Sequence, residues 1–179
     1  MQQATSPDPV DDPKGYQDML VGLVGADDPA EIQAAAPELI RQLVAEAGDL
    51  LDRRPTEGEW SALECIAHML DAEIVASGRY RWILAHDQPE LIGYDQDLWV
   101  HRLHAPIESV EELLAAWEPL RRANLALWAR TPVADRERFG VHRERGPESY
   151  ALTFTLIAGH DRFHLAQARR ALAAVAREG

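Results

Sequence analysis

Three histidines have the spacing of metal ligands. His160 and His164 are four positions apart in a long apolar-periodic segment near the C-terminus, and a helix turning about 100° per residue places them on one face. That spacing lets two imidazoles reach one metal ion, as in the paired histidines of zinc helices. A third histidine, His68, lies against the apolar stripe of another predicted helix. If the two helices face each other, the three imidazoles converge and leave a coordination position open.

The same histidines also have a purely structural interpretation. Histidine pairs at this spacing occur often by chance, and a buried imidazole needs a hydrogen-bond partner when it binds no metal. Both interpretations therefore stay open: a reactive metal site, or a metal-free bundle with satisfied core histidines.

Polar residues near these histidines are candidates to orient them. A ligating imidazole usually donates its second N–H to a carboxylate, a carbonyl or water, and Glu64, Asp71 and Gln167 each lie one helical turn from a histidine. Glu64 has an alternative role, because Ser61 and Glu64 have the spacing of a capping box at a helix start. The catalytic group itself would be a metal-bound water or thiol rather than a protein side chain.

Other residues with chemical potential have simpler interpretations. His101 and His104 lie in an irregular connection and are not expected to be ligands. His142 precedes a Gly-Pro turn and is expected to be an exposed loop histidine. Cys65 could offer a thiolate, but a small buried apolar residue is the favoured interpretation. Asp161 points about 100° away from the preceding histidine, which favours a solvated or interhelical role over ligation.

Helical periodicity dominates the elements that must position these residues. Helices are expected over residues 15–24, 28–53, 62–85, 108–128 and 150–176. Asp28 should cap the second of these with Glu31 closing a capping box, Pro37 predicts a kink or restart in it, and Pro119 predicts a bend in the fourth. The connections 86–107 and 131–149 are long, and no stretch shows β-alternation. The predicted fold is an all-α four-helix bundle with a long crossover between helices two and three and a short extra N-terminal helix.

Composition narrows the class of protein. Residues 1–13 are polar, acidic and proline-rich and predict a disordered tail, and residues 14–179 predict a single bundle domain. The formal net charge of −12 argues against nucleic acid and anionic membranes as partners. A single cysteine excludes an intrachain disulfide. Neither a secretion signal nor a membrane span is recognisable, so a cytoplasmic location is expected.

The chain resembles the DinB-like (YfiT-like) superfamily. The likeness rests on Trp60-Ser61 leading into residues 66–73 and on residues 160–167, and it extends through residues 79–81, 88–91, 121–122 and 140–146. The resemblance implies a four-helix bundle with a parallel crossover between its second and third helices. It also implies a divalent metal ion (nickel, zinc or iron) held by His68, His160 and His164, and a homodimer.

Two classes of function follow from the metal site and the resemblance. Relatives include thiol-dependent S-transferases, isomerases and metal-dependent hydrolases, so a small-molecule substrate or a thiol cosubstrate is expected. A thiol carrying carboxylates would need basic residues near the metal, for which six arginines are available: Arg79, Arg81, Arg121, Arg122, Arg143 and Arg145. The alternative is a non-catalytic metal-binding or stress-related interaction protein in which the ion clamps two helices, and a fourth protein ligand such as Cys65 or Asp71 would favour it.

Overall fold

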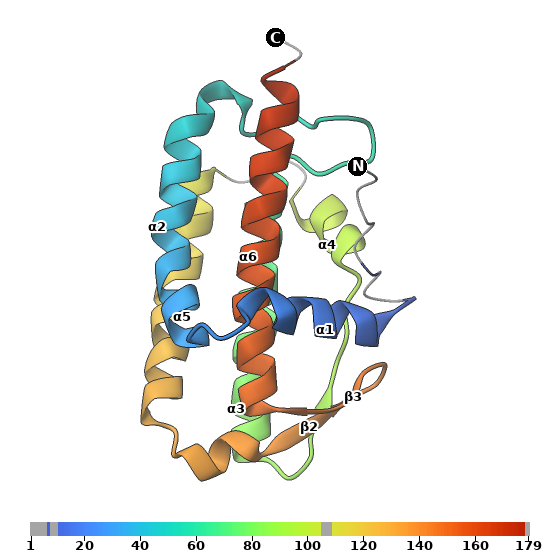
Figure 1. Cartoon of the computed structure of the whole chain (residues 1–179), viewed down its shortest axis with the longest axis vertical. Coiled ribbons are helices and arrows are strands. Elements are labelled where there is room, and N and C mark those ends of the chain that lie inside the picture. The colour runs from blue at the N-terminus through green and yellow to red at the C-terminus, as the bar shows by residue number, and fades with distance from the viewer. Residues whose placement is uncertain (1–6, 8–10, 105–108, 178–179) are drawn as a thin grey trace.

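The two histidine-bearing helices, α3 (Ala62–Ala85) and α6 (Tyr150–Val175), pack against each other at the centre of the molecule (Figure 1). This computed structural model describes residues 7, 11–104 and 109–177. In it, α2 (Pro29–Ala47) packs on α6, α5 (Val110–Arg130) packs on α3, and α2 and α5 also contact each other. The predicted four-helix bundle is therefore confirmed.

A crossover joins the second and third helices of the bundle. Figure 1 shows α3 and α5 running in the same direction, so the chain must return along the bundle between them. The returning segment holds a two-residue strand, β1 (Glu90–Leu91), and a helix, α4 (Gln96–Leu103), and residues 105–108 lie outside the described part. The predicted crossover is confirmed, but it is more regular than its sequence indicates.

A small sheet lies at one end of the bundle. β1 pairs in parallel with β2 (Phe139–His142), and β2 pairs antiparallel with β3 (Gly146–Ser149). A Cβ atom on Gly140 would lie 2.7 Å from the Leu91 side chain, so only glycine allows β1 to pack this closely. The sequence alone predicts no strand, and that prediction is wrong. Strands of two to four residues are too short to show a recognisable alternation.

Side-chain caps explain where the helices begin. Ser61 and Glu64 form the predicted capping box at the start of α3, and Ser109 begins α5 with the same arrangement. Asp28 caps α2, but its carboxylate accepts from the N–H of the second helical residue at 2.8 Å. The capping box predicted between Asp28 and Glu31 is not among the hydrogen bonds of these described residues.

Prolines within two helices do not end them. α2 continues through Pro37 and α5 continues through Pro119, so the predicted restart at Pro37 is wrong. α2 ends at Ala47, earlier than predicted, because Gly48 adopts a positive φ of 52° and begins a short 3-10 turn, η1 (Gly48–Leu50).

The N-terminal helix α1 (Pro13–Val24) lies across α6 rather than along it (Figure 1). Asp12 caps it by accepting from the Gly15 N–H at 2.9 Å. A Cβ atom on Gly159 would lie 2.2 Å from the Leu20 carbonyl oxygen, so the crossing requires glycine at this position. α1 is thereby held directly beside the predicted ligands of α6. Most of the predicted disordered tail, residues 1–6 and 8–10, lies outside the described residues.

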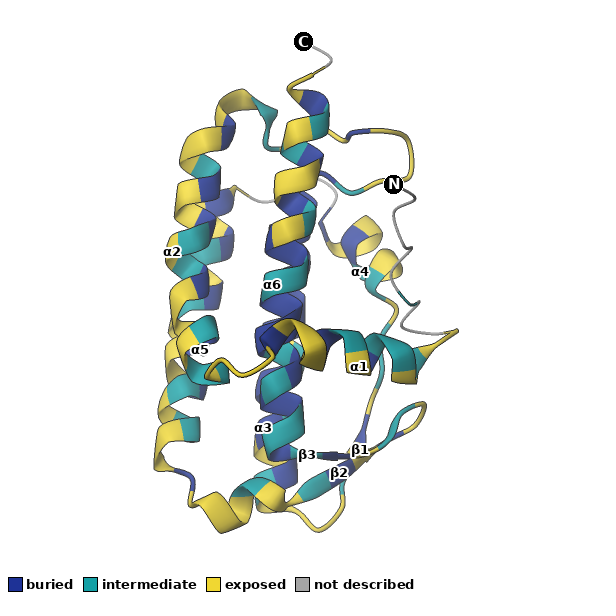
Figure 2. Ribbon diagram, in the orientation of Figure 1, coloured by how far each residue is buried: buried dark blue, intermediate teal, exposed yellow. Residues whose placement is uncertain are grey.

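Apolar side chains fill the space between the four bundle helices, whose buried faces turn inward in Figure 2. One cluster, which includes Ile40, Ile66 and Trp117, joins α2, α3, α5 and α6. A second cluster extends the core toward the sheet and is built on the aromatic rings of Tyr80, Tyr150 and Phe154. Both clusters include residues of α3 and α6, so packing fixes the helices that carry the histidines.

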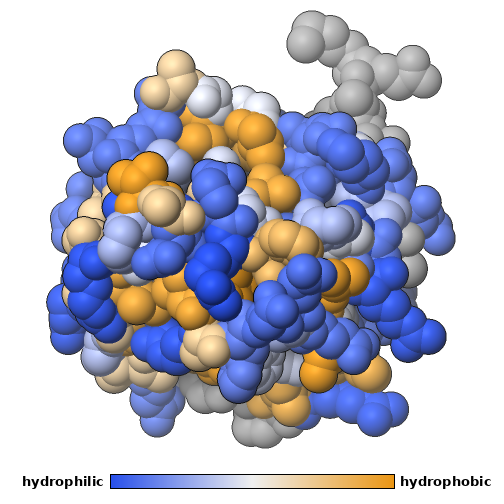
Figure 3. Space-filling view, turned by 90° about the horizontal axis from the view of Figure 1, so that it is seen from below, coloured by the Kyte–Doolittle hydropathy of each residue, from blue (hydrophilic) through white to orange (hydrophobic). Residues whose placement is uncertain are grey.

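The surface is mixed in character. Figure 3 shows small hydrophobic groups between hydrophilic ones at the end of the bundle where the sheet and η2 (Val133–Glu137) lie. None of the described helices is long and apolar enough to cross a bilayer. The homodimer stays a prediction, for which α1 and α3 offer exposed apolar residues: Val21, Leu23, Ile74 and Trp82.

Candidate metal centre

The structure brings the three predicted histidine ligands together. His68 projects from the middle of α3, and His160 and His164 project from successive turns of α6. One ring nitrogen from each lies within 4.8 Å of the others, and the Nε2 atoms of His68 and His160 are 2.9 Å apart. All three side chains are buried. Because both helices contribute, the cluster exists only in the folded chain.

Burial keeps these imidazoles uncharged. Desolvation lowers the pKa of His68 and of His160 well below 6.5, and the neighbouring histidines lower both further. Desolvation also lowers the pKa of His164, to about 3. At neutral pH each ring therefore offers a lone pair on one nitrogen, which is the form that binds a metal ion.

Hydrogen bonding shows that the site fits a divalent ion. His164 Nδ1 lies 2.9 Å from Gln167 Oε1, so Nδ1 carries the proton and donates it to the amide oxygen. The lone pair is then on His164 Nε2, which is buried and has no hydrogen-bond partner. Three nitrogens bound to zinc would lie about 3.3 Å apart, which falls within the spacing of this cluster. The donor set, the orphaned atom and the spacing all suit an ion held by three imidazoles.

The three residues predicted to orient the histidines differ in what they contact. Gln167 contacts His164 as described above. Glu64 is engaged in the capping box and in an ion pair with Arg54, and none of the hydrogen bonds among the described residues joins it to a histidine of the cluster. Asp71 lies 3.0 Å from His104 Nε2. Only His68, His160 and His164 form a potential metal-binding group among the described residues, so neither Asp71 nor Cys65 supplies a fourth ligand.

Aromatic rings enclose the cluster. Trp60 stacks on His164 with its ring centroid 6.0 Å away, and it lies 5.0 Å from the ring of His68. Phe163 meets His164 edge-on at 4.9 Å, and Tyr94 lies 6.3 Å from His68. Sequence reasoning did not assign these rings to the site, although Trp60 stands at the start of the motif that leads into α3.

Two other predictions about single residues have opposite outcomes. His142 is not an exposed loop residue: it ends β2, is buried, and lies 3.3 Å from the Arg79 guanidinium. The prediction is wrong because His142 owes its burial to pairing with β1, which no local pattern shows. Cys65 is a buried core residue as predicted, and burial, with a smaller effect of Glu64, raises the pKa of its thiol to about 12. It is therefore uncharged at neutral pH.

A second buried polar cluster holds α3, α5 and α6 in position. Arg121 of α5 donates to Glu73 of α3 at 2.9 Å and to Asp161 of α6 at 3.1 Å. Asn124 donates to the other Glu73 oxygen at 2.7 Å. Asp161 is thus the interhelical residue predicted, and the partner that explains its burial is 40 positions away in sequence.

Cavities open on two sides of the histidines. One of about 620 Å³ is lined by His160 together with residues of α1, α3, α6, the hairpin and the segment before α4. We call it the His160 cavity. Another of about 640 Å³ is lined by His164, Gln167 and Trp60, and we call it the His164 cavity. Both have the size of small-molecule sites, and each borders a different histidine of the cluster.

The chain resembles known proteins over most of its length. Residues 27–168 match the sequence pattern of the DinB superfamily. Two proteins of Oceanobacillus iheyensis, each named "Putative metal-dependent hydrolase", are 26% identical over 133 residues (73% of this chain, 76% of the relative) and 24% identical over 124 residues (68% and 70%). The fold is similar to that of YfiT from Bacillus subtilis, described as "a probable metal-dependent hydrolase with an unusual four-helix bundle topology". The two structures match with a TM-score of 0.75 and 17% identity, over 98% of this chain and 93% of YfiT. This chain therefore belongs to the DinB superfamily.

Proposed function

We propose that this protein is a metal-dependent hydrolase whose substrate enters the His160 cavity. The observation that carries the proposal is the convergence of three uncharged, buried imidazoles, each of which has a ring nitrogen without a hydrogen-bond partner. A purely structural histidine cluster would be expected to satisfy its ring nitrogens within the protein. The names of the two Oceanobacillus relatives support the same class of reaction.

The three histidines and the residues around them have different tasks in this proposal. His68, His160 and His164 would hold the ion, which when bound lowers the pKa of a water or thiol ligand. Gln167 fixes the orientation and tautomer of His164 by accepting its Nδ1 proton. Trp60 covers two of the rings and limits the approach of bulk water from its side. The His160 cavity supplies the space for a small organic substrate.

Transfer to a thiol is the second candidate reaction. The specific observation that favours it is the His164 cavity, because a hydrolase needs only one organic substrate whereas a transferase needs two. Arg170 lines this cavity together with Gln167 and could bind an acidic thiol there. Water would act in the hydrolase and a low-molecular-weight thiol in the transferase, on the same three histidines.

The proposal is tested by loading the metal-free protein separately with zinc, nickel and iron. Hydrolysis of ester, amide and phosphoester substrates is then compared with the conjugation of electrophiles to added thiols, in wild type and in His160→Ala. We expect hydrolysis by one metal form and its loss in the variant. Turnover that needs a thiol would establish the transferase. Metal binding without turnover in either assay would contradict both reactions and favour the non-catalytic interaction protein.

A further inference from the structure

Arg79 is a partly buried cation without a carboxylate partner. It projects from α3 and lines the His160 cavity. One Nη2 proton goes to the Ile92 carbonyl oxygen at 2.6 Å, and Nε is buried with no hydrogen-bond partner. No carboxylate of the described residues forms an ion pair with it. A guanidinium is always charged and carries five donors, so this side chain retains both unused charge and unused donors.

His142 adds a second donor at the same place. The Glu144 backbone N–H lies 3.3 Å from His142 Nδ1, and Arg79 Nη2 lies 3.3 Å from His142 Nε2, so the uncharged ring can accept from only one of these two donors. When Nδ1 accepts from Glu144, Nε2 carries the proton. Burial, followed by the charges of Arg145 and Arg79, lowers the pKa of His142 to about 4 and keeps it uncharged at neutral pH. Its Nε2–H then faces Arg79 Nη2 at 3.3 Å. Two donors thus meet where an acceptor is needed.

Other charges around the cavity do not supply that acceptor. Arg145 is paired with Glu148, which is fully buried and also accepts from Gln17 at 3.4 Å. The remaining acidic residues that line the cavity are exposed to solvent, where water screens their charge; they are Asp11, Asp95, Asp97 and Glu144. Arg79 therefore contributes a partly buried positive charge to the cavity that forms no ion pair with a described carboxylate.

We propose that Arg79 and His142 form a binding subsite for a carboxylate group of the substrate. The inference rests on the proposed function, because the same cavity is lined by His160. A planar guanidinium binds the two oxygens of a carboxylate side by side, and the Nε2–H of His142 would bind one of them. The substrate is then a small acidic molecule, with its reacting group at the histidine cluster and its carboxylate at Arg79.

The full-length metal-free protein allows a test that needs no turnover. The side-chain N–H resonances of its arginines are followed by NMR during titration with succinate, with inorganic phosphate and with the neutral diamide of succinate. Succinate should shift the Arg79 Nε–H saturably, and the diamide should not. Arg79→Gln should weaken succinate binding at least about ten-fold, and Arg79→Lys should weaken it less.

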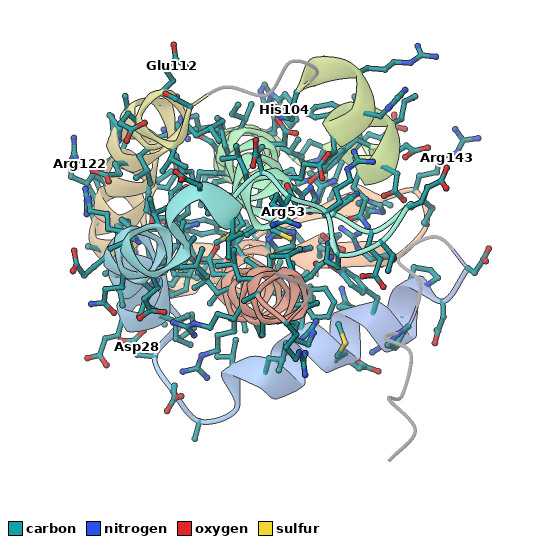
Figure 4. The ribbon with its side chains drawn as sticks, turned by 90° about the horizontal axis from the view of Figure 1, so that it is seen from above. Asp28, Arg53, His104, Glu112, Arg122 and Arg143 are labelled. Carbon is teal, nitrogen blue, oxygen red and sulfur yellow. The ribbon has the colours of Figure 1, made fainter. Side chains whose placement is uncertain are left out.

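Arg143→Gln is the matched control. Arg143 follows His142 on the β2–β3 hairpin, and its replacement makes the same charge change as Arg79→Gln, but it is exposed and points away from the bundle (Figure 4). It should leave succinate binding unchanged. Equal losses in Arg143→Gln and Arg79→Gln, or no shift of the Arg79 resonance in wild type, would overturn the subsite. Binding of phosphate alone would also overturn the carboxylate assignment. If Arg79→Gln does not fold, the test is whether succinate saturably shifts the Arg79 Nε–H resonance of wild type.

Zinc uptake measured on the same samples separates the two proposals. A wild type that binds succinate through Arg79 but takes up no zinc would refute the metalloenzyme and leave the carboxylate subsite standing. A wild type that binds zinc but shows no succinate-dependent shift would refute the subsite alone. Arg79→Gln should retain the zinc stoichiometry of wild type, because Arg79 contacts none of the three histidines.

Discussion

Two buried polar clusters join α3 and α6, and they differ in how well their hydrogen bonds are satisfied. In the arginine cluster, Arg121 is bonded to Glu73, Asp161 and the Gln33 carbonyl oxygen, and Asn124 completes Glu73. In the histidine cluster, the ring nitrogens His68 Nδ1, His160 Nδ1 and His164 Nε2 have no partner. The same two helices therefore hold one polar cluster whose hydrogen bonds are satisfied within the protein and another in which three ring nitrogens have no partner among the described residues.

This difference shows how two residues that are adjacent in sequence can belong to different clusters. His160 and Asp161 are adjacent in sequence, but the helix turns them about 100° apart. His160 faces the histidine cluster, whereas Asp161 faces Arg121. A satisfied buried network fixes structure. An unsatisfied one costs stability unless something binds there, which points to a ligand.

Lowering the pH should distinguish the two clusters most strongly, because their titratable groups change the free energy of unfolding in opposite directions. The folded-state pKa values of the three histidines lie below 6.5, that of His164 at about 3, so unfolding takes up protons below pH 6.5. Each histidine then costs up to about 1.4 kcal/mol of stability per pH unit as the pH falls. Asp161 has the opposite effect, because burial raises its pKa to about 6 against the opposing effect of Arg121. Between pH 6 and pH 3.8 the folded state therefore binds this proton more tightly than the unfolded state, and Asp161 favours folding as the pH falls through this range.

Denaturant unfolding of the metal-free protein between pH 7 and pH 4 measures this balance. The histidines outnumber the aspartate, so stability should fall steeply as acid is added. His164→Leu should reduce the slope by about one proton. If stability depends on pH with the same slope in His164→Leu and in wild type, the buried and uncharged state of the His164 ring is contradicted.

Removing the central cation should disrupt the satisfied cluster. Arg121→Met leaves Glu73 and Asp161 buried without their partner, and breaking a buried ion pair in this way costs about 3–5 kcal/mol. Chemical denaturation should show this loss. Arg122→Met is the control, since that side chain is 70% exposed and should change stability by less than about 0.5 kcal/mol. Equal effects of the two substitutions would show that Arg121 does not hold the helices together.

The smallest effect is expected at the edge of the histidine cluster. Gln167→Ala removes the acceptor that orients His164, and such a loss typically lowers metal affinity 10- to 100-fold. Competition with a zinc chelator measures the affinity, and the exposed Gln42→Ala serves as control. An unaltered affinity in Gln167→Ala would place the amide outside the metal centre.

Local signals accounted for the parts of the molecule that depend on neighbours in sequence. Ser61 and Glu64 predicted the start of α3 correctly because a capping box is a four-residue interaction. The spacing of His164 and Gln167 placed both on successive turns of one helix. These features follow from the helical period alone.

Features that depend on distant partners could not be predicted. His142 is buried by a parallel pairing with Leu91, about 50 positions earlier, and its environment includes Arg79 of another helix. Helical spacing turned Asp161 away from the histidines, but only the folded chain shows Arg121 as its partner. Such long-range contacts carry no signature in a single sequence, and they include the donors of the carboxylate subsite.

The measurement that tests the central claim most directly is the metal content of protein purified without added metal and without nickel affinity resin. Wild type, His160→Ala and the exposed-histidine control His101→Ala are compared, before and after exposure to zinc, nickel and iron. We predict about one ion per chain in wild type and in His101→Ala, and none retained by His160→Ala. A wild type that takes up no metal, or a His160→Ala protein that keeps its full content, would contradict the three-histidine metal centre.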